Sequence, residues 1–214
     1  MIEDLLQKIK KFKNLRSNPV VVSSRLRLAR NLKDYSFPNR ANITLKCDIL
    51  SKVKSVLSKE LDQENDFFFN IDELDNLEKK CLIERHLISN ELCEYSKGSA
   101  VYITNDFNYS IMINEEDHIR IQCIKQGFNL NNLWKSISFI DDTIEAKLPY
   151  SFSNELGYLT SCPTNLGTGL RASVMLHLPG FALTNNIDED DVTVIFEPDG
   201  KRFISGVSIG KNQL

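Results

Sequence analysis

Several patterns that identify common classes of protein are missing from this sequence. No apolar run approaches the length that crosses a bilayer, and the N-terminal residues MIEDLLQKIKKFK lack the uninterrupted apolar core of a signal peptide. The five cysteines are odd in number, irregularly spaced and without a CxxC pair, which argues against a disulfide framework or a structural zinc site. We therefore expect a protein of the reducing cytoplasm with no membrane partner.

Two nucleotide-binding signatures are also missing. The sequence contains no GxxxxGK[ST] loop and no GxGxxG after an expected strand, so a nucleotide site would have to use other groups. The net charge of −3, from 26 basic and 29 acidic side chains, gives no reason to expect nucleic acid as a partner. Apolar residues make up 42% of the 214 residues, which is enough for a sizeable core.

The order of the expected elements mixes helices and strands without a strict βαβ alternation. Apolar spacing predicts helices over 1–14, 42–61, 71–85, 115–126, 133–148 and 169–178. Strands are predicted over 20–22, 101–104, 109–113, 157–161, 192–196 and 203–209, the last two as a hairpin. This order predicts an α+β fold with a largely antiparallel sheet flanked by helices.

Three arginines lie within six residues in the segment SSRLRLAR. In an extended chain Arg25 and Arg27 point to the same side, because side chains alternate with a period of two. Two guanidinium groups on one face suit a polyphosphate, since each can donate two hydrogen bonds to phosphate oxygens. The alternative is a solvated basic strand edge.

The segment NEEDHIR is richer in acidic side chains than a helix start requires. Asn114 is a good N-cap, and the following acids would complement the helix dipole. Arg120 lies four residues after Glu116, a spacing at which the two side chains can pair. Alternatively, they face a shared pocket in which one holds a cationic substrate and the other an anionic cofactor.

A third segment, SCPTNLGTGLRAS, leads from an expected strand into an expected helix. Its glycines and small polar residues would expose backbone N–H groups near a helix N-terminus, which favours anions and the thiolate of Cys162. Arg171 would lie in the first turn of that helix, where a bound phosphate would compensate its charge. The alternative is an ordinary polar loop with a buried cysteine.

Together these segments resemble the ATP:guanidino phosphotransferase (phosphagen kinase) family. The similar stretches are SSRLRLAR, LIERHLIS, NEEDHIR and GYLTSCPTNLGTGLRASV, in the order typical of the family and spread over residues 18–184. ARNLKDYSFP, LIERHLIS and RASVMLHLP resemble the bacterial protein-arginine kinase (McsB) type. The resemblance implies the phosphagen-kinase, glutamine-synthetase-like catalytic fold.

The resemblance also implies roles for individual residues. It implies four ligands of the ATP phosphates: Arg25, Arg27, Arg120 and Arg171. It implies that His86 lies beside the adenosine, that Glu116 holds the substrate guanidinium and acts as base, and that Cys162 contacts the same guanidinium. Magnesium would accompany the nucleotide, and no protein residue is expected to bind a metal directly.

The similarity fades after Thr184. The family continues with an RGxxGE-type loop that carries a second catalytic carboxylate and another phosphate-binding arginine, and neither role can be assigned here. Glu197 and Arg202 are interpreted as surface charges of the expected hairpin. We expect a partial catalytic domain over 1–184, an incomplete sheet, and a divergent segment over 185–214.

Three functions are compatible with these residues. The first is an ATP-dependent protein-arginine kinase that acts on exposed arginines of proteins. The second is a catalytically impaired homologue that binds nucleotide or a stress-response partner and regulates it. The third is a small-molecule guanidino kinase. The resemblance further implies a zinc-binding activator and a Clp-type protease pathway as partners.

Overall fold

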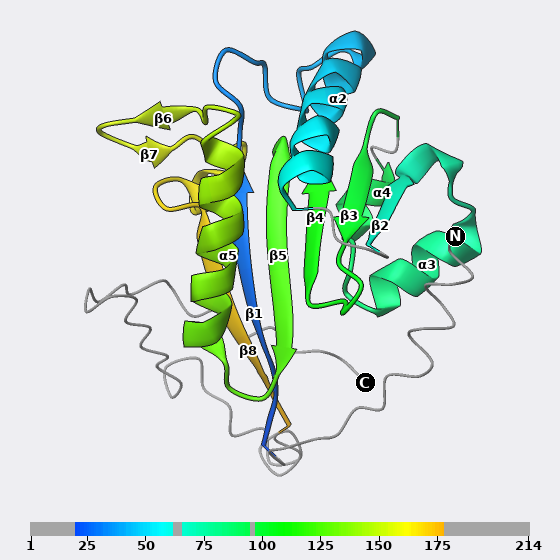
Figure 1. The fold of residues 1–214 in the computed structure, drawn as a ribbon, viewed down its shortest axis with the longest axis vertical. Coiled ribbons are helices and arrows are strands. Elements are labelled where there is room, and N and C mark those ends of the chain that lie inside the picture. Colours follow the sequence, from blue (N-terminus) through cyan, green and yellow to red (C-terminus); the bar gives the residue numbers. More distant parts are fainter. Residues whose placement is uncertain (1–19, 62–65, 95–96, 178–214) are drawn as a thin grey trace.

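A six-stranded antiparallel sheet forms the centre of the molecule. The computed structural model describes residues 20–61, 66–94 and 97–177. The strand order is β2-β3-β4-β5-β1-β8, and every neighbouring pair is antiparallel. The strands are β1 (Val21–Arg30), β2 (Phe67–Asn70), β3 (Ala100–Ile103), β4 (Tyr109–Ile113), β5 (Ile119–Gln126) and β8 (Leu170–Leu176). The predicted α+β class with a largely antiparallel sheet is confirmed (Figure 1).

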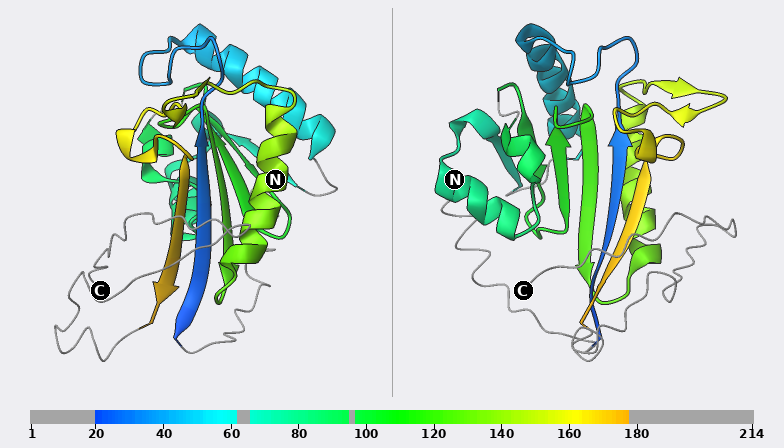
Figure 2. Two further views of the ribbon diagram at one scale, coloured as in Figure 1. Left: turned by 90° about the vertical axis from the view of Figure 1, so that its left-hand side faces the viewer. Right: turned by 180° about the vertical axis from the view of Figure 1, so that it is seen from behind.

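Helices cover the two faces of the sheet unequally. Helices α2 (Ile43–Glu60) and α5 (Leu130–Glu145) pack on one face (Figure 1; Figure 2, left). Helices α3 (Asn76–Glu84) and α4 (Asn90–Glu94) pack on the opposite face, at the β2–β3 side. Successive β3 residues divide between the two cores, because Tyr102 joins the α2–α5 core and Val101 joins the α3–α4 core.

The predicted helices over 42–61 and 133–148 are both present. Asn42 caps α2 by accepting a hydrogen bond from the backbone N–H of Leu45 at 2.9 Å. A buried stripe of residues four apart then holds α2 on the sheet: Ile49, Val53 and Leu57. Helix α5 begins three residues before its predicted start and ends at Glu145. A small hairpin follows it, formed by β6 (Phe152–Ser153) and β7 (Gly157–Tyr158).

The segment predicted as one helix over 71–85 is divided. A 3₁₀ turn η1 (Ile71–Glu73) comes first, and α3 starts after Asp75. Asp75 accepts from the N–H of Glu78 at 2.7 Å, and the Glu78 carboxylate accepts from the N–H of Asp75 at 2.8 Å. This capping box satisfies two backbone donors at a new helix start, so the helix begins there rather than at Ile71.

The helix predicted over 115–126 is wrong. Residues 114–118 form the turn of a β-hairpin, which the Asn114 N–H closes by donating to the His118 carbonyl at 2.9 Å, and strand β5 follows. Asn114 has a φ of 56° and does not cap a helix, because its side chain donates to the carbonyls of Lys46 and Gly98. Pairing with β1 and β4 on both sides outweighs the helical signal of the acidic residues.

The helix predicted over 169–178 is also wrong, since β8 occupies this segment. Leu170, Ala172 and Val174 pack against the α2–α5 core, and the residues between them are exposed. This alternation has the period of a strand and not of a helix. Residues 169–177 therefore provide no helix N-terminus that would favour an anion beside Cys162. The expected elements over 1–14, 192–196 and 203–209 lie outside the described residues.

Candidate functional site

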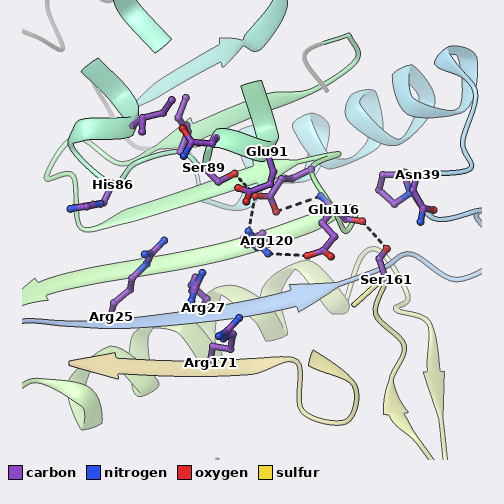
Figure 3. A pocket seen from close by; sticks show the side chains of 15 residues that line it. Arg25, Arg27, Asn39, His86, Ser89, Glu91, Glu116, Arg120, Ser161 and Arg171 are labelled. Atoms are coloured by element: carbon purple, nitrogen blue, oxygen red, sulfur yellow. Dashed lines mark hydrogen bonds and ion pairs between the residues drawn. The ribbon is translucent and has the colours of Figure 1, made fainter. Parts of the chain in front are cut away.

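Four arginines lie on the face of the sheet that α3 and α4 leave partly open. Arg25 and Arg27 alternate along β1, and Arg27 is opposite Gln122 on β5 and Arg171 on β8. Arg120 lies two residues before Gln122 and therefore shares its face. All four guanidinium groups line one cleft of about 580 Å³, and Figure 3 shows them side by side along the strands. Segments far apart in the chain thus bring four arginines together at the base of the cleft, and we call this group the arginine floor.

The arginines of this floor raise one another's electrostatic energy. Burial, followed by the charges of Arg25, Arg120 and Arg171, lowers the pKa of Arg27 to about 10. Burial, then the charge of Arg120, also lowers the pKa of Arg25. The Nε of Arg27 is buried and has no hydrogen-bond partner within the described part of the chain. An anion with several oxygens would supply the missing acceptor and relieve the repulsion.

His86 stands above the arginine floor at one end of the cleft. It has a φ of 57°, in the left-handed region that few non-glycine residues occupy. Its carbonyl accepts a hydrogen bond from Gln122, whose side-chain oxygen in turn accepts from the Nε of Arg25 at 2.8 Å. Desolvation and the charge of Arg25 lower the pKa of His86, which favours a neutral ring at neutral pH. The chain preceding α4 is therefore tied directly to the floor.

Two consecutive glutamates in the β4–β5 turn differ in their surroundings. The Glu115 side chain is fully buried, pairs with Arg120 at 2.6 Å and accepts from the hydroxyl of Ser89. The Glu116 side chain is 41% exposed and lies 3.4 Å from Arg120 (Figure 3). The predicted pairing of Glu116 with Arg120 is present, and both side chains also line the same cleft. Glu116 is the carboxylate of this pair that a ligand can reach.

The pKa of Glu116 is raised from its ordinary value. Desolvation is the largest cause, and the nearby charges of Asp117, Glu115 and Glu91 act in the same direction. The positive charge of Arg120 opposes them. A carboxylate with a raised pKa is a stronger base than an ordinary surface glutamate.

The predicted cysteine lies just beyond the cleft. Ser161 lines the cleft and Cys162 follows it, partly exposed, with its Sγ 3.0 Å from the Oγ1 of Thr164. The loop continues through the 3₁₀ turn η2 (Pro163–Asn165) into β8. Gly157 allows β7 to pack closely against this loop, because a Cβ added to Gly157 would lie 2.5 Å from the Gly167 carbonyl oxygen. The structure thus brings six of the seven predicted residues onto one cleft and leaves Cys162 at its border.

Sequence reasoning missed several residues around this cleft. Glu115 accepts a hydrogen bond from Arg120, and Gln122 accepts one from Arg25. Three further residues line the cleft: Ser89, Glu91 and Asn39. The strand-like alternation Arg120, Gln122 on β5 was the available signal for Gln122. Nothing local in the sequence marks these residues, because the fold brings the α3–α4 region, with Ser89 and Glu91, and the loop before α2, with Asn39, to the cleft.

Two features are absent from the part of the chain that the structure describes. No helix within residues 20–61, 66–94 or 97–177 is long and apolar enough to span a bilayer. The same residues contain no cluster of three or more histidine, cysteine, aspartate or glutamate side chains that could hold a metal ion.

Comparison with known proteins relates this geometry to a family. The family model described as "ATP:guanido phosphotransferase, C-terminal catalytic domain" matches residues 48–194. The protein-arginine kinase of Clostridium novyi is 49% identical over 176 residues, which cover 82% of this chain and 51% of that protein. The protein-arginine kinase of Brevibacillus brevis is 46% identical over 170 residues, covering 78% of this chain and 48% of that protein. The chain therefore spans about half the length of these curated relatives.

Solved structures agree with the sequence comparison. A duplicated taurocyamine kinase from Schistosoma mansoni, with bound transition state analog components, superposes with a TM-score of 0.71 and 25% identity, covering 82% of this chain and 26% of that one. Lombricine kinase superposes with a TM-score of 0.68 and 22% identity, covering 81% and 52%, and supports the fold alone. Because the family model matches residues 48–194, more than half of the chain, the chain belongs to the ATP:guanido phosphotransferase family.

Proposed function

We propose that this chain carries the nucleotide-binding and acceptor-binding groups of a protein-arginine kinase, which transfers the γ-phosphate of ATP to arginine side chains of proteins. The observation that carries the proposal is the meeting of four arginines with Glu116 on one cleft. Relatives that are 42–49% identical and bear the name protein-arginine kinase support the choice of acceptor.

Phosphates of ATP would lie on the arginine floor. Arg25, Arg27 and Arg171 present guanidinium groups from neighbouring strands, and Arg120 completes the set. The unpartnered Nε of Arg27 and the lowered pKa values of Arg25 and Arg27 fit an anion of high charge. His86, at the end of the cleft next to Arg25, would contact the nucleoside. Magnesium bound to the nucleotide would neutralise further phosphate charge.

Glu116 and Cys162 would handle the acceptor. A protonated guanidinium is a poor nucleophile, so transfer needs a group that orients it and accepts its proton. Glu116 is exposed to the cleft and has a raised pKa, which suits both tasks. Cys162, one residue from the cleft wall, would make a second contact with the same guanidinium. Transfer then depends mainly on positioning and charge stabilisation.

Other parts of the proposal rest on family resemblance. We assign the activity to a catalytic domain over residues 1–184, with 185–214 as a separate segment, and we expect it to act in the cytoplasm on proteins with exposed arginines. A zinc-binding activator and a Clp-type protease pathway are the partners that the resemblance implies.

The test is transfer of labelled phosphate from magnesium-ATP to an arginine-rich protein, followed by detection of acid-labile phosphate. We expect label on the protein, loss of that label with Glu116→Gln, and little label on free arginine. Retained ATP binding without any transfer would contradict the enzyme and favour a regulatory nucleotide-binding role. Efficient labelling of free arginine would instead favour a small-molecule guanidino kinase.

A further inference from the structure

A buried side chain just after β1 connects the two loops that carry Glu116 and Cys162. Asn31 is 1% exposed, and its Nδ2 donates to the Oδ1 of Asp117 at 2.6 Å and to the carbonyl of Leu159 at 3.1 Å. Its Oδ1 accepts from the backbone N–H of His118 at 2.9 Å. One side-chain amide thus forms hydrogen bonds both with the turn after β4 and with the segment that leads to Cys162.

Asp117 continues this connection. Its Oδ1 also accepts from the backbone N–H of Ser161 at 2.7 Å, and its carboxylate is fully buried. The Oδ2 of Asp117 has no hydrogen-bond partner within the described residues. Asn31 and the Ser161 N–H are therefore the hydrogen-bond donors that hold this carboxylate. A third bond closes the arrangement, since the Ser161 hydroxyl donates to the Glu116 carbonyl at 2.7 Å.

The chemistry of this position requires an amide. The side chain at 31 must donate to a carboxylate and to a carbonyl while accepting from an N–H, and among side chains of this size asparagine alone offers two N–H donors together with a carbonyl acceptor. An aspartate would keep the shape but place an oxygen against Asp117 and Leu159, where repulsion replaces the two bonds. Replacing the Nδ2 of Asn31 by an oxygen is thus enough to disrupt this position.

We propose that Asn31, acting through Asp117, is a positioning residue that sets the separation between Glu116 and Cys162 and so shapes the acceptor half of the cleft. The arginine floor does not depend on this connection, because the strand pairings of β1 with β5 and β8 hold Arg25 and Arg27. Disturbing Asn31 should therefore affect the acceptor and spare the nucleotide. This inference rests on the proposed function for its meaning, but its geometry can be tested separately.

The first test measures amide hydrogen exchange at Ser161 in wild-type protein and in Asn31→Asp and Asn31→Ala. We expect exchange to accelerate about tenfold or more in both variants, because Asp117 is no longer held toward the Ser161 N–H. The matched control is Ser24→Ala. Ser24 is a buried β1 residue whose hydroxyl donates a hydrogen bond to the Gly127 carbonyl at 2.7 Å. Its side chain lies on the opposite face of the sheet from the arginines, and seven residues of extended chain place it about 23 Å from Asn31. Unchanged exchange in the Asn31 variants, or equal acceleration in Ser24→Ala, would overturn the inference.

The second test separates acceptor from nucleotide in steady-state kinetics. We expect the Asn31 variants to raise KM for the protein acceptor or lower kcat by about tenfold, with KM for magnesium-ATP within about twofold of wild type. Parallel changes in both KM values would overturn the positioning role. If both Asn31 variants fail to fold, Ser161→Ala decides, because it removes only the bond to the Glu116 carbonyl and should raise the acceptor KM alone. An acceptor KM that Ser161→Ala leaves unchanged would then overturn the inference.

The outcomes distinguish the two proposals. Absence of phosphate transfer by the wild-type protein would overturn the proposed function, and Ser161 exchange would still decide whether Asn31 holds the two loops together. Normal transfer with unchanged Ser161 exchange would overturn the role of Asn31 and leave the proposed function standing.

Discussion

Arg27 of β1 and Arg171 of β8 are directly opposite one another in the antiparallel pair, so two like charges meet across neighbouring strands. Such pairs oppose folding unless something binds between them. Arg171 is exposed, and Arg27 has a buried, unpartnered Nε and is only partly compensated by the charge of Glu115. The arrangement costs stability in the free protein and becomes favourable when an anion is bound.

Replacing Arg171 should therefore stabilise the free protein and weaken nucleotide binding. We expect Arg171→Gln to raise the free energy of unfolding by about 0.2–1 kcal/mol in urea titrations. We expect the same change to weaken magnesium-ATP binding about tenfold, as the loss of one charged hydrogen bond implies. Lys125→Gln, an exposed cation near the end of β5, is the control and should change neither quantity. Unchanged ATP affinity in Arg171→Gln would contradict a phosphate role.

The pH dependence of transfer should reflect Glu116. The base acts in its ionised form, so the rate should fall as the pH drops through a pKa that lies above the ordinary glutamate value. The nearby charge of Glu91 contributes to that raised pKa, so Glu91→Gln should move the acid limb of the kcat/KM profile to lower pH. Glu94→Gln on the same short helix is the control, since Glu94 does not line the cleft. A shift to higher pH in Glu91→Gln would contradict the assignment.

Cys162 should affect the acceptor more than the nucleotide. Cys162→Ala is expected to lower kcat/KM for the protein acceptor about tenfold to a hundredfold, because a group that holds the guanidinium is lost. Its affinity for magnesium-ATP, measured by calorimetry, should stay within about twofold, since the thiol lies beyond the arginine floor. The exposed Cys47 on α2 provides the control, and Cys47→Ala should match wild type in both measurements. Equal activity in Cys162→Ala and wild type would remove this residue from the site.

Stability should depend on a buried ion pair behind the cleft. Arg30 bonds Asp141 of α5 at 2.7 Å, donates to the Thr168 carbonyl at 2.9 Å and lies 3.7 Å from the ring centre of Tyr158. We expect Asp141→Ala to lower the free energy of unfolding by about 3–5 kcal/mol, because it leaves the buried Arg30 uncompensated. The adjacent, exposed Asp142 gives a matched control, and Asp142→Ala should stay within about 0.5 kcal/mol of wild type. A loss as small as that in Asp141→Ala would show that the pair contributes little.

Long, strongly periodic elements were predictable from the sequence. Helices α2 and α5 follow from buried residues at helical spacing, such as Ile49 and Val53, and the β3–β4 pair follows from two apolar runs around a turn. The antiparallel α+β class followed from the order of these elements. The shared face of Arg25 and Arg27 followed from the period of a strand alone.

The two wrong helices share a physical cause. Ile119, Ile121 and Cys123 of β5 alternate with polar residues of the cleft face, and Leu170 to Leu176 alternates between core and surface. Each strand nevertheless follows a segment with helix-start character, acidic in one case and glycine-rich in the other. Pairing with β1, which lies between them in the sheet, decides their structure, and this partner is distant in sequence. The bridge from Asn31 to Asp117 was out of reach for the same reason, since 86 residues separate the bonded groups.

The central claim is that the arginines of β1, β5 and β8 form a triphosphate site, and a calorimetric titration with magnesium-ATP tests it most directly. Wild-type protein should bind one nucleotide with an affinity that falls as salt is added, and tripolyphosphate should compete for the site. Arg27→Lys should weaken binding about tenfold or more, whereas Arg40→Lys, an exposed arginine outside the cleft, should leave it unchanged. Binding that tripolyphosphate does not affect, or that both variants retain in full, would contradict the account.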